Sequence, residues 1–385
     1  MLHHNPHIAL IAGERSGDRL GAPLIAALRA HFPQARFTGI GGELMQAAGL
    51  ESFADMNRLS VMGFSEVLLH LSDIWQLKND LLQRWQADRP DLFIGIDAPD
   101  FTLRIAAALH QHGVQTVHYV SPSLWAWKAG RIKQIKRAVD HVLCLFPFET
   151  DIYHQHHMGA TWVGHPMKDR IKTQSIAQAR QKLGIFNNHR PVIGLFSGSR
   201  VQEIKRLLPI FLAAAQKIKS HHHDLALIIS LSDKRHEHLI KTLVNNRLSS
   251  TENVFISNAD SALLMSACDV LMLKSGTITL EATLLQRPML SAYRVHPLTA
   301  FIARRLIKIP HFSLPNILAG RAVIHEWIQE NCTPEYLAHD AETLLTDPEI
   351  RARQLSALAE IAEQLPENVS QRAAAVIADL LKENK

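Results

Sequence analysis

The sequence has few cysteines and no long apolar run, and both absences narrow the classes of protein to consider. Its 385 residues include only Cys144, Cys268 and Cys332, which are far apart and form no CxxC pair. This argues against a disulfide framework or a zinc site and favours a reducing compartment such as the cytoplasm. No stretch reaches about 18 uninterrupted apolar residues, so no membrane-spanning helix is expected.

The N-terminus also lacks the features of a signal peptide, and the chain lacks a strong excess of charge. The short apolar run after His7 follows no Lys/Arg-rich segment and is cut short at Glu14, so no signal peptide is expected. Lys and Arg number 41 against 36 Asp and Glu, a net charge of +5. This mild excess suits an anionic substrate or an anionic membrane surface, and no nucleic-acid partner is expected.

Short apolar runs alternate with helix-like stretches along most of the chain. This rhythm predicts an α/β protein with two Rossmann-like, doubly wound lobes that face each other across a cleft. We expect an N-terminal lobe at 1–165, a C-terminal lobe at 166–365 and a last helix within 366–385 that returns to the first lobe. The expected strands are 7–12, 36–40, 92–97, 115–120, 140–145 and 160–163, then 191–196, 225–231, 253–257, 269–273 and 287–292.

A polar loop at 13–18 follows the first expected strand. Its glycine spacing does not fit the GxGxxG dinucleotide loop, which disfavours a nicotinamide enzyme. Glu14, Ser16 and Asp18 would place hydroxyl and carboxylate groups at the mouth of the first sheet, where they suit a polyhydroxyl ligand. The alternative is an ordinary capped helix start, with Ser16 or Asp18 as the N-cap.

Asp97 is the candidate general base. The apolar run 92–96 would deliver it to the carboxyl end of the sheet, where ligands bind in open α/β folds, and partial burial there would help it accept a hydroxyl proton. The alternative is that Asp97 only satisfies loop N–H groups. Asp100 is expected to cap the next helix, and the Asp-Ala-Pro-Asp run does not indicate a tightly bound divalent metal.

A loop at 118–128 contains Ser121, Trp125 and a second tryptophan, and it suits stacking on a sugar or covering an acyl chain; an ordinary packed loop is the alternative. The stretch 64–82 has apolar residues on more than one side of a helix. It predicts a core helix that also has a lipid-facing surface. The residues of that surface are Val67, Leu68, Leu71, Ile74 and Trp75.

Two helix starts in the second half suit an anion. Ser199 and Arg200 offer backbone donors and a guanidinium, which fit a diphosphate. The second start, Ser275-Gly276-Thr277, opens a helix in which Glu281 could accept hydrogen bonds from ribose hydroxyls. A third loop, at 313–316, would present the amide of Asn316. Ordinary capped helices remain the alternative for both starts.

Seven motifs in order resemble the lipid-A-disaccharide synthase family. They are GE-x-SGD at 13–18, VMG at 61–63, GIDAPDF at 95–101, HYVSPSLWAWK at 118–128, GSR-x-x-EI at 198–204, SGT-x-x-LE at 275–281 and SLPN-x-LAGR at 313–321. The resemblance runs from about residue 7 to at least 330. Arg15 departs from it where a small residue or proline is expected, and Phe196-Ser197 stands where a leucine-proline pair is common.

The resemblance implies a GT-B glycosyltransferase, peripheral on the cytoplasmic face of a Gram-negative inner membrane. Its implied reaction moves 2,3-diacylglucosamine from the UDP derivative to 2,3-diacylglucosamine 1-phosphate (lipid X), with inversion and release of UDP. No cofactor or metal is implied, and a homodimer is a further expectation.

The resemblance also implies roles for individual residues. Asp97 would be the base. The acceptor-side or cleft residues would be Glu14, Ser16, Asp18, Ser121 and Trp125. The nucleotide-sugar site would comprise Ser199, Arg200, Ser275, Gly276, Thr277, Glu281 and Asn316. Two alternatives remain open: another UDP-sugar enzyme of this fold, such as an epimerase or a transferase with a soluble acceptor, and a non-catalytic nucleotide-sugar-binding paralogue.

Overall fold

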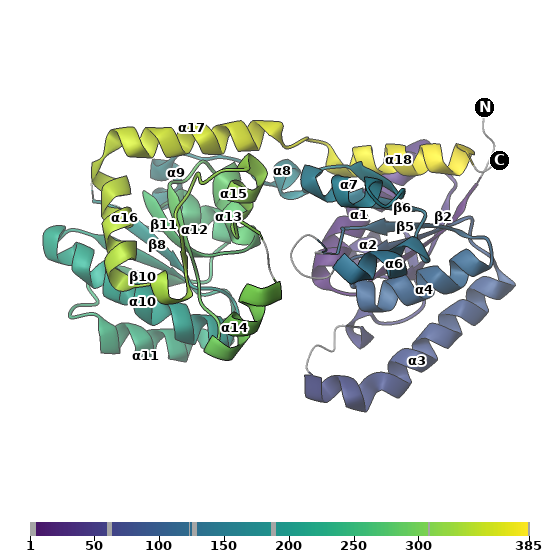
Figure 1. Cartoon of the computed structure of the whole chain (residues 1–385), viewed down its shortest axis with the longest axis horizontal. Coiled ribbons are helices and arrows are strands. Elements are labelled where there is room, and N and C mark those ends of the chain that lie inside the picture. Colours follow the sequence, from purple (N-terminus) through teal and green to yellow (C-terminus); the bar gives the residue numbers. More distant parts are fainter. Residues whose placement is uncertain are drawn as a thin grey trace. The chain divides into compact units, whose positions relative to one another are not determined.

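The chain forms two compact units, each built on its own parallel sheet (Figure 1). The first unit comprises Met1–Asp169 with Pro366–Lys385, and the second comprises Arg170–Leu365. The computed structural model describes residues 5–59, 64–122, 124, 129–185, 190–306 and 309–383, without the side chains of 64–71, 129, 302–306 and 383. The prediction of an α/β protein with two doubly wound parallel sheets is confirmed.

The first unit contains a seven-stranded sheet in the order β3-β2-β1-β4-β5-β6-β7. Every residue of β1 and β4 is buried, because helices cover both faces of a parallel sheet, and this explains their continuous apolar runs. The strands are β1 (His7–Ala12), β2 (Arg36–Ile40), β3 (Leu50–Ser52), β4 (Leu92–Ile96), β5 (Gln115–Tyr119), β6 (His141–Cys144) and β7 (Gly159–Trp162).

The helices of the first unit include one from the end of the chain. That helix, α18, packs beside α1, and the Asp169 carboxylate accepts hydrogen bonds from the N–H groups of Asn368 (2.7 Å) and Val369 (2.8 Å) at its start. The helices are α1 (Arg15–His31), α2 (Glu43–Ala47), α3 (Phe64–Ala87), α4 (Pro99–Gln111), α6 (Ile132–Lys136), α7 (Pro147–His154) and α18 (Val369–Glu383), with 3-10 turns η1 (Met56–Arg58) and η2 (Ala129–Arg131); α8 (Met167–Arg170) ends at the border with the second unit.

The second unit contains a six-stranded sheet in the order β10-β9-β8-β11-β12-β13. Its strands are β8 (Val192–Phe196), β9 (Ala226–Ser230), β10 (Val254–Ser257), β11 (Val270–Lys274), β12 (Met289–Tyr293) and β13 (Glu326–Ile328). Its helices are α9 (Ile176–Lys182), α10 (Val201–His221), α11 (Glu237–Arg247), α12 (Ser261–Ser266), α13 (Thr277–Leu284), α14 (Pro297–Leu306), α15 (Leu314–Ala319), α16 (Pro334–Thr346) and α17 (Pro348–Gln364), with 3-10 turns η3 (Lys234–His236) and η4 (Gln329–Asn331).

The strand order reverses at one point in each sheet, between β1 and β4 in the first and between β8 and β11 in the second. At such a switch point the chain leaves neighbouring strands toward opposite faces, and ligands bind outside the carboxyl ends. The loops that follow these four strands lead into α1, α4, α10 and α13. Together with the first turns of these helices, the loops contain most of the residues predicted for the catalytic, cleft and nucleotide-sugar sites.

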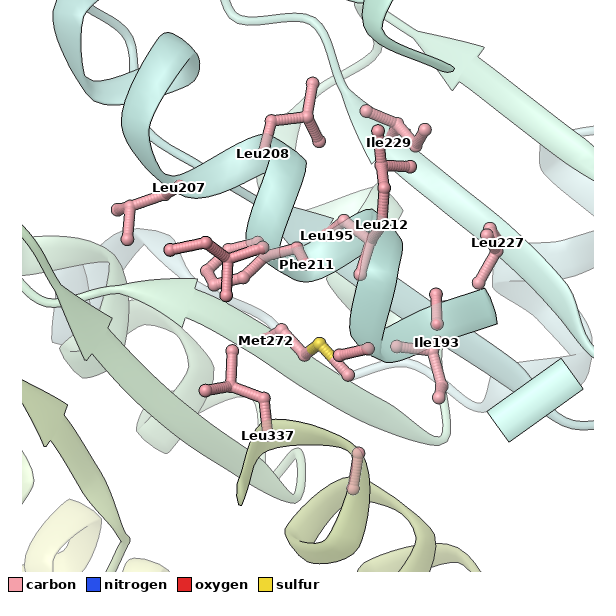
Figure 2. Packing of buried hydrophobic residues seen from close by; sticks show 14 of the residues in the cluster. Ile193, Leu195, Leu207, Leu208, Phe211, Leu212, Leu227, Ile229, Met272 and Leu337 are labelled. Atoms are coloured by element: carbon pink, nitrogen blue, oxygen red, sulfur yellow. The ribbon is translucent and has the colours of Figure 1, made fainter. Parts of the chain in front are cut away.

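The core of the second unit shows how the sequence pattern holds a sheet in place. Apolar side chains of α10, spaced at helical intervals, pack on β8, β9 and β11 (Figure 2). Phe211 is fully buried among them, and Leu337 of α16 closes the same cluster. Burial of this kind fixes the start of α10, and with it the loop at 198–200.

Two short strands were not predicted. Both β3 and β13 have three residues, with an exposed or half-buried polar residue in each, so neither gives an apolar run that sequence reasoning can recognise. Each lies at an edge of its sheet, where pairing with one neighbour suffices.

Candidate active site

Two loops meet at the switch point of the first sheet because glycines allow a close approach. A Cβ atom on Gly13 would lie 2.6 Å from the Cβ of Ala98, and one on Gly17 would lie 3.1 Å from the Cβ of Ala12. A side chain at Gly13 would push the two loops apart, and one at Gly17 would push α1 away from the end of β1. Gly13 therefore lets the loop after β1 lie against Ala98, the residue that follows Asp97.

Asp97 is held by its backbone and leaves its carboxylate available. Asp97 and Ala98 both have positive φ, +52° and +43°, which is uncommon for residues other than glycine and often marks a functional site. The Asp97 N–H donates to the Tyr119 carbonyl (3.0 Å), and the Thr102 hydroxyl donates to the Asp97 carbonyl (2.9 Å). The side chain is half-buried, and no described residue forms a hydrogen bond or ion pair with its carboxylate. This disfavours the alternative in which the carboxylate only satisfies loop N–H groups.

The predicted helix cap at Asp100 is wrong. Helix α4 begins at Pro99 with Ala98 as its N-cap and with no side-chain cap. Asp100 lies one residue inside the helix and forms an ion pair with Arg131 of η2. Proline is well suited to the first helical position because its missing N–H has no intrahelical partner there, so the helix starts earlier than the cap pattern indicates.

The alternative in which Ser16 or Asp18 caps α1 is not what the structure shows. The N-cap is Glu14, which makes no side-chain cap hydrogen bond, and Ser16 is exposed in the first turn. Asp18 is buried, and its two carboxylate oxygens accept the N–H groups of Leu44 (3.2 Å) and Met45 (3.0 Å). Asp18 therefore anchors the start of α2, and we remove it from the residues expected to contact a ligand.

The loop after β5 is described only in part, and Trp125 lies outside the described residues. Ser121 is buried, and its hydroxyl lies 2.8 Å from the Tyr153 hydroxyl, whose pKa is raised by burial. The prediction that Ser121 faces a ligand is therefore not supported by its geometry. Its hydroxyl instead ties this loop to α7.

Glu149, a buried carboxylate that the sequence analysis did not single out, belongs to the same helix as Tyr153. Glu149 accepts the N–H groups of Leu145 and Phe146, both at 3.0 Å, and is buried at the start of α7. Loss of hydration raises its pKa to about 7, although the two N–H donors act in the opposite direction. The signal was present in the sequence, since an acidic residue two positions after a proline often lies in the first turn of a helix.

In the second unit, the backbone donors at 199–200 are already engaged. The Glu203 carboxylate accepts the N–H groups of Ser199 (3.1 Å) and Arg200 (3.3 Å). Gly198 has φ +110°, and a Cβ there would collide with that carboxylate, so glycine is required. In this structure the Glu203 carboxylate occupies the N–H groups that were predicted to bind a diphosphate, so their role in binding stays a prediction. The Arg200 guanidinium is 82% exposed and lies 3.9 Å from the other Glu203 oxygen, and the Ser199 side chain is exposed.

The start of α13 remains open to an anion. Its N-cap is Gly276, which provides no side-chain cap, and within the described chain the N–H groups of Thr277 and Ile278 have no acceptor. Thr277 is exposed, whereas Ser275 is buried and donates its hydroxyl to the Phe312 carbonyl (3.0 Å). Ser275 thus holds the neighbouring loop, and Thr277 with the helix start can face a ligand.

Glu281 and Asn316, both predicted to contact the nucleotide-sugar, differ in how far other residues of the chain engage their side chains. Glu281 is half-buried, accepts the Ser261 hydroxyl (2.5 Å) and has a pKa raised mainly by burial. Asn316 is buried; its amide oxygen accepts the N–H groups of Val323 (2.7 Å) and Ile324 (2.9 Å), and its nitrogen donates to the Ile324 carbonyl (2.9 Å). This geometry does not support the prediction that Asn316 presents its amide to a ligand.

Among the side chains of helix α3 that the structure describes, an aromatic one is strongly exposed. Trp75 is 65% exposed and Ile74 is half-buried, whereas Leu77 is 3% exposed and belongs to the core. The side chains of Val67, Leu68 and Leu71 lie outside the described residues. In the described part of the chain, no helix is long and apolar enough to cross a membrane.

Comparison with known proteins identifies the family. The model of the family described as lipid-A-disaccharide synthetase matches residues 8–380. The chain belongs to the lipid-A-disaccharide synthase family. A lipid-A-disaccharide synthase of Alkalilimnicola ehrlichii is 42% identical over 373 residues, covering 96% of this chain and 97% of that protein. One of Alcanivorax borkumensis is 42% identical over 380 residues and covers 98% of each.

Solved structures of GT-B glycosyltransferases and epimerases share the fold of this chain. A putative UDP-N-acetylglucosamine 2-epimerase from Listeria monocytogenes aligns with a TM-score of 0.68 at 15% identity, over 99% of this chain and 98% of that one. The glycotransferase of kitacinnamycin aligns with a TM-score of 0.60 at 16% identity, over 97% and 98%. At this identity the likeness concerns the fold alone.

Proposed function

We propose that this chain is a lipid-A-disaccharide synthase that transfers 2,3-diacylglucosamine from its UDP derivative to the 6-hydroxyl of 2,3-diacylglucosamine 1-phosphate. The hydroxyl oxygen attacks the anomeric carbon as the bond to the diphosphate breaks, and UDP leaves with the electron pair. A single in-line displacement inverts the anomeric centre and gives the β-1,6 disaccharide. Membership of the family is the main support for this reaction.

Asp97 is the proposed base, and this role depends on one observation. Its half-buried carboxylate lies at the switch point of the first sheet and is engaged by no described donor, while the backbone on both sides of it is fixed. A carboxylate held in place with free oxygens can accept the proton of a hydroxyl bound beside it. Glu14, the N-cap of α1, and Ser16 in its first turn are the proposed acceptor-side groups.

The proposed donor site lies in the second unit. The Arg200 guanidinium, the Ser199 hydroxyl and the open start of α13 at Gly276 and Thr277 would stabilise the departing diphosphate, where negative charge develops. Glu281 would accept a hydrogen bond from a ribose hydroxyl through the carboxylate oxygen that Ser261 does not occupy.

The proposal is tested by following UDP release from purified protein. Given UDP-2,3-diacylglucosamine and 2,3-diacylglucosamine 1-phosphate together, the protein should release UDP and form a tetraacyl disaccharide phosphate detected by mass spectrometry. Omitting the acceptor should stop UDP release. Release without acceptor would indicate a hydrolase or an epimerase-like elimination, and no release with both substrates would indicate a binding protein.

We also propose that α3 contacts the cytoplasmic face of the inner membrane. The support is the exposed Trp75 beside Ile74, since an exposed indole next to an aliphatic residue is suited to the boundary of a bilayer. Flotation with vesicles that contain anionic lipid should weaken for Trp75→Ser and stay unchanged for Leu44→Ser, an exposed apolar control in the same unit. A homodimer stays a prediction, which sedimentation would test.

A further inference from the structure

Lys274 has a confined position that the sequence motifs do not explain. It is the last residue of β11, and its side chain is only 24% exposed. Its ammonium nitrogen lies 3.4 Å from a carboxylate oxygen of Glu203 and 5.6 Å from the centre of the Tyr293 ring. A Cβ on Gly276 would lie 3.5 Å from the same nitrogen, so the ammonium group lies beside the loop that opens α13.

Glu203 is shared between two loops. One of its oxygens accepts the N–H groups of Ser199 and Arg200. The other lies 3.4 Å from the Lys274 ammonium nitrogen and 3.9 Å from the Arg200 guanidinium. One carboxylate therefore engages two cations and both backbone donors at the carboxyl ends of β8 and β11. These are the groups that an incoming diphosphate would need, because charge-assisted hydrogen bonds to N–H and ammonium groups are how proteins hold phosphate.

The energetics favour exchange of this carboxylate for a ligand. Lys274 and the open N-terminus of α13 are both electropositive, and Glu203 is only 19% exposed, so water screens these charges little. A diphosphate has more negative charge than one carboxylate and can contact both groups together. The Tyr293 ring supports the ammonium group through its face and does not compete for a phosphate oxygen.

We propose that Lys274 binds the diphosphate of the donor and that Glu203 is its counter-ion in the nucleotide-free protein, an internal anion with which the diphosphate competes. This assignment rests on the proposed UDP-sugar donor. Glu203 then has a second role, in addition to accepting hydrogen bonds from the loop at 198–200. When it pairs with Lys274 again, it weakens the binding of UDP and so favours product release.

The test measures binding of UDP and of uridine to the full chain by calorimetry, with no acceptor present. Lys274→Ala should weaken UDP binding at least tenfold and leave uridine binding unchanged, because uridine has no phosphate. Lys274→Arg should keep most of the UDP affinity. Lys205→Ala removes an exposed lysine from α10 and is the matched control, with UDP affinity as in the wild type.

Glu203→Gln separates the two roles of Glu203, since an amide oxygen can still accept the N–H groups of the loop. It should tighten UDP binding several-fold and slow UDP release, and most of both effects should vanish in the Lys274→Ala background, with the longer Arg200–Glu203 pair (3.9 Å) accounting for the remainder. Unchanged UDP affinity in Lys274→Ala would overturn the assignment of Lys274. Weaker UDP binding by Glu203→Gln in both backgrounds would overturn the competition and leave Glu203 as a brace only.

Failure of this inference is distinguishable from failure of the proposed function. In one case, the wild type turns over both substrates and Lys274→Ala binds UDP normally. That result would refute the role of Lys274 and support the proposed reaction. In the other case, the wild type does not turn over both substrates, and Lys274→Ala weakens the binding of UDP but not of uridine. That result would support Lys274 as a diphosphate ligand and refute the proposed reaction.

Discussion

Replacing Asp97 with asparagine should remove most of the turnover and leave the fold intact. Asparagine is chosen because residue 97 has φ +52°, a conformation that asparagine adopts more readily than alanine. The Asp97 carboxylate makes no hydrogen bond to any described residue, so an amide of the same shape removes no native contact. The free energy of unfolding should therefore change by less than about 0.5 kcal/mol.

The loss of activity follows from the proposed role. A positioned general base contributes about 10²- to 10⁴-fold to the rate, which is about 3–5 kcal/mol of transition-state stabilisation. We expect Asp97→Asn to lower kcat by this factor in the UDP-release assay, with UDP binding by calorimetry unchanged. Asp97→Ala should lose as much activity and also about 1 kcal/mol of stability, because an alanine is strained at this φ.

Asp100→Asn is the matched control. It lies three residues further along, is 80% exposed and pairs with Arg131, and surface pairs contribute about 0–1 kcal/mol. Its turnover and melting temperature should match those of the wild type. Wild-type kcat/KM in Asp97→Asn would refute Asp97 as the base, and an equal loss of UDP binding and turnover would make its role structural.

Three further changes test the remaining structure. Asn316→Ala should lower the free energy of unfolding by about 2–4 kcal/mol in urea titrations, because it leaves buried backbone groups without partners; a mild effect would mean that water replaces the amide. The pKa of Glu149 is raised to about 7 in the folded chain, so the stability that this carboxyl contributes is fully present below about pH 4 and is lost as the pH rises through about 7. Relative to wild type, Glu149→Gln should therefore gain up to about 3 kcal/mol between pH 4 and pH 8, and parallel pH profiles would contradict this. Phe211→Ala should destabilise the second unit by about 3–5 kcal/mol without changing the UDP site below the melting temperature, as differential scanning calorimetry with and without UDP would show.

The sequence was sufficient to predict the strands at the centre of both sheets. β1, β4, β8 and β11 are continuous apolar runs because helices cover both of their faces, and each is followed by a small-residue turn. It also placed Asp97 at the carboxyl end of β4, since a strand that ends in a polar residue delivers that residue to the edge of the sheet.

The sequence did not reveal which polar residues already have partners within the chain. Asp18, Asn316 and Ser275 all lie in motifs that resemble a ligand site, yet each is buried and bonded to backbone elsewhere. Their partners are 27, 7 and 37 residues away, and the hydrogen-bonding role of a side chain at such a separation is decided by which segments pack together.

What the sequence alone determined is therefore the order of the elements and the edge of each sheet at which chemistry can occur, because local apolar patterning and loop position carry that information. Only the tertiary structure decided which carboxylates remain open. Asp97 is fixed through its backbone, and no described residue engages its carboxylate oxygens. Asp18 is instead engaged by N–H groups, and Glu203 by N–H groups and cations. The physical reason is that a buried polar group must find a partner, and only packing determines whether that partner is the protein or a substrate.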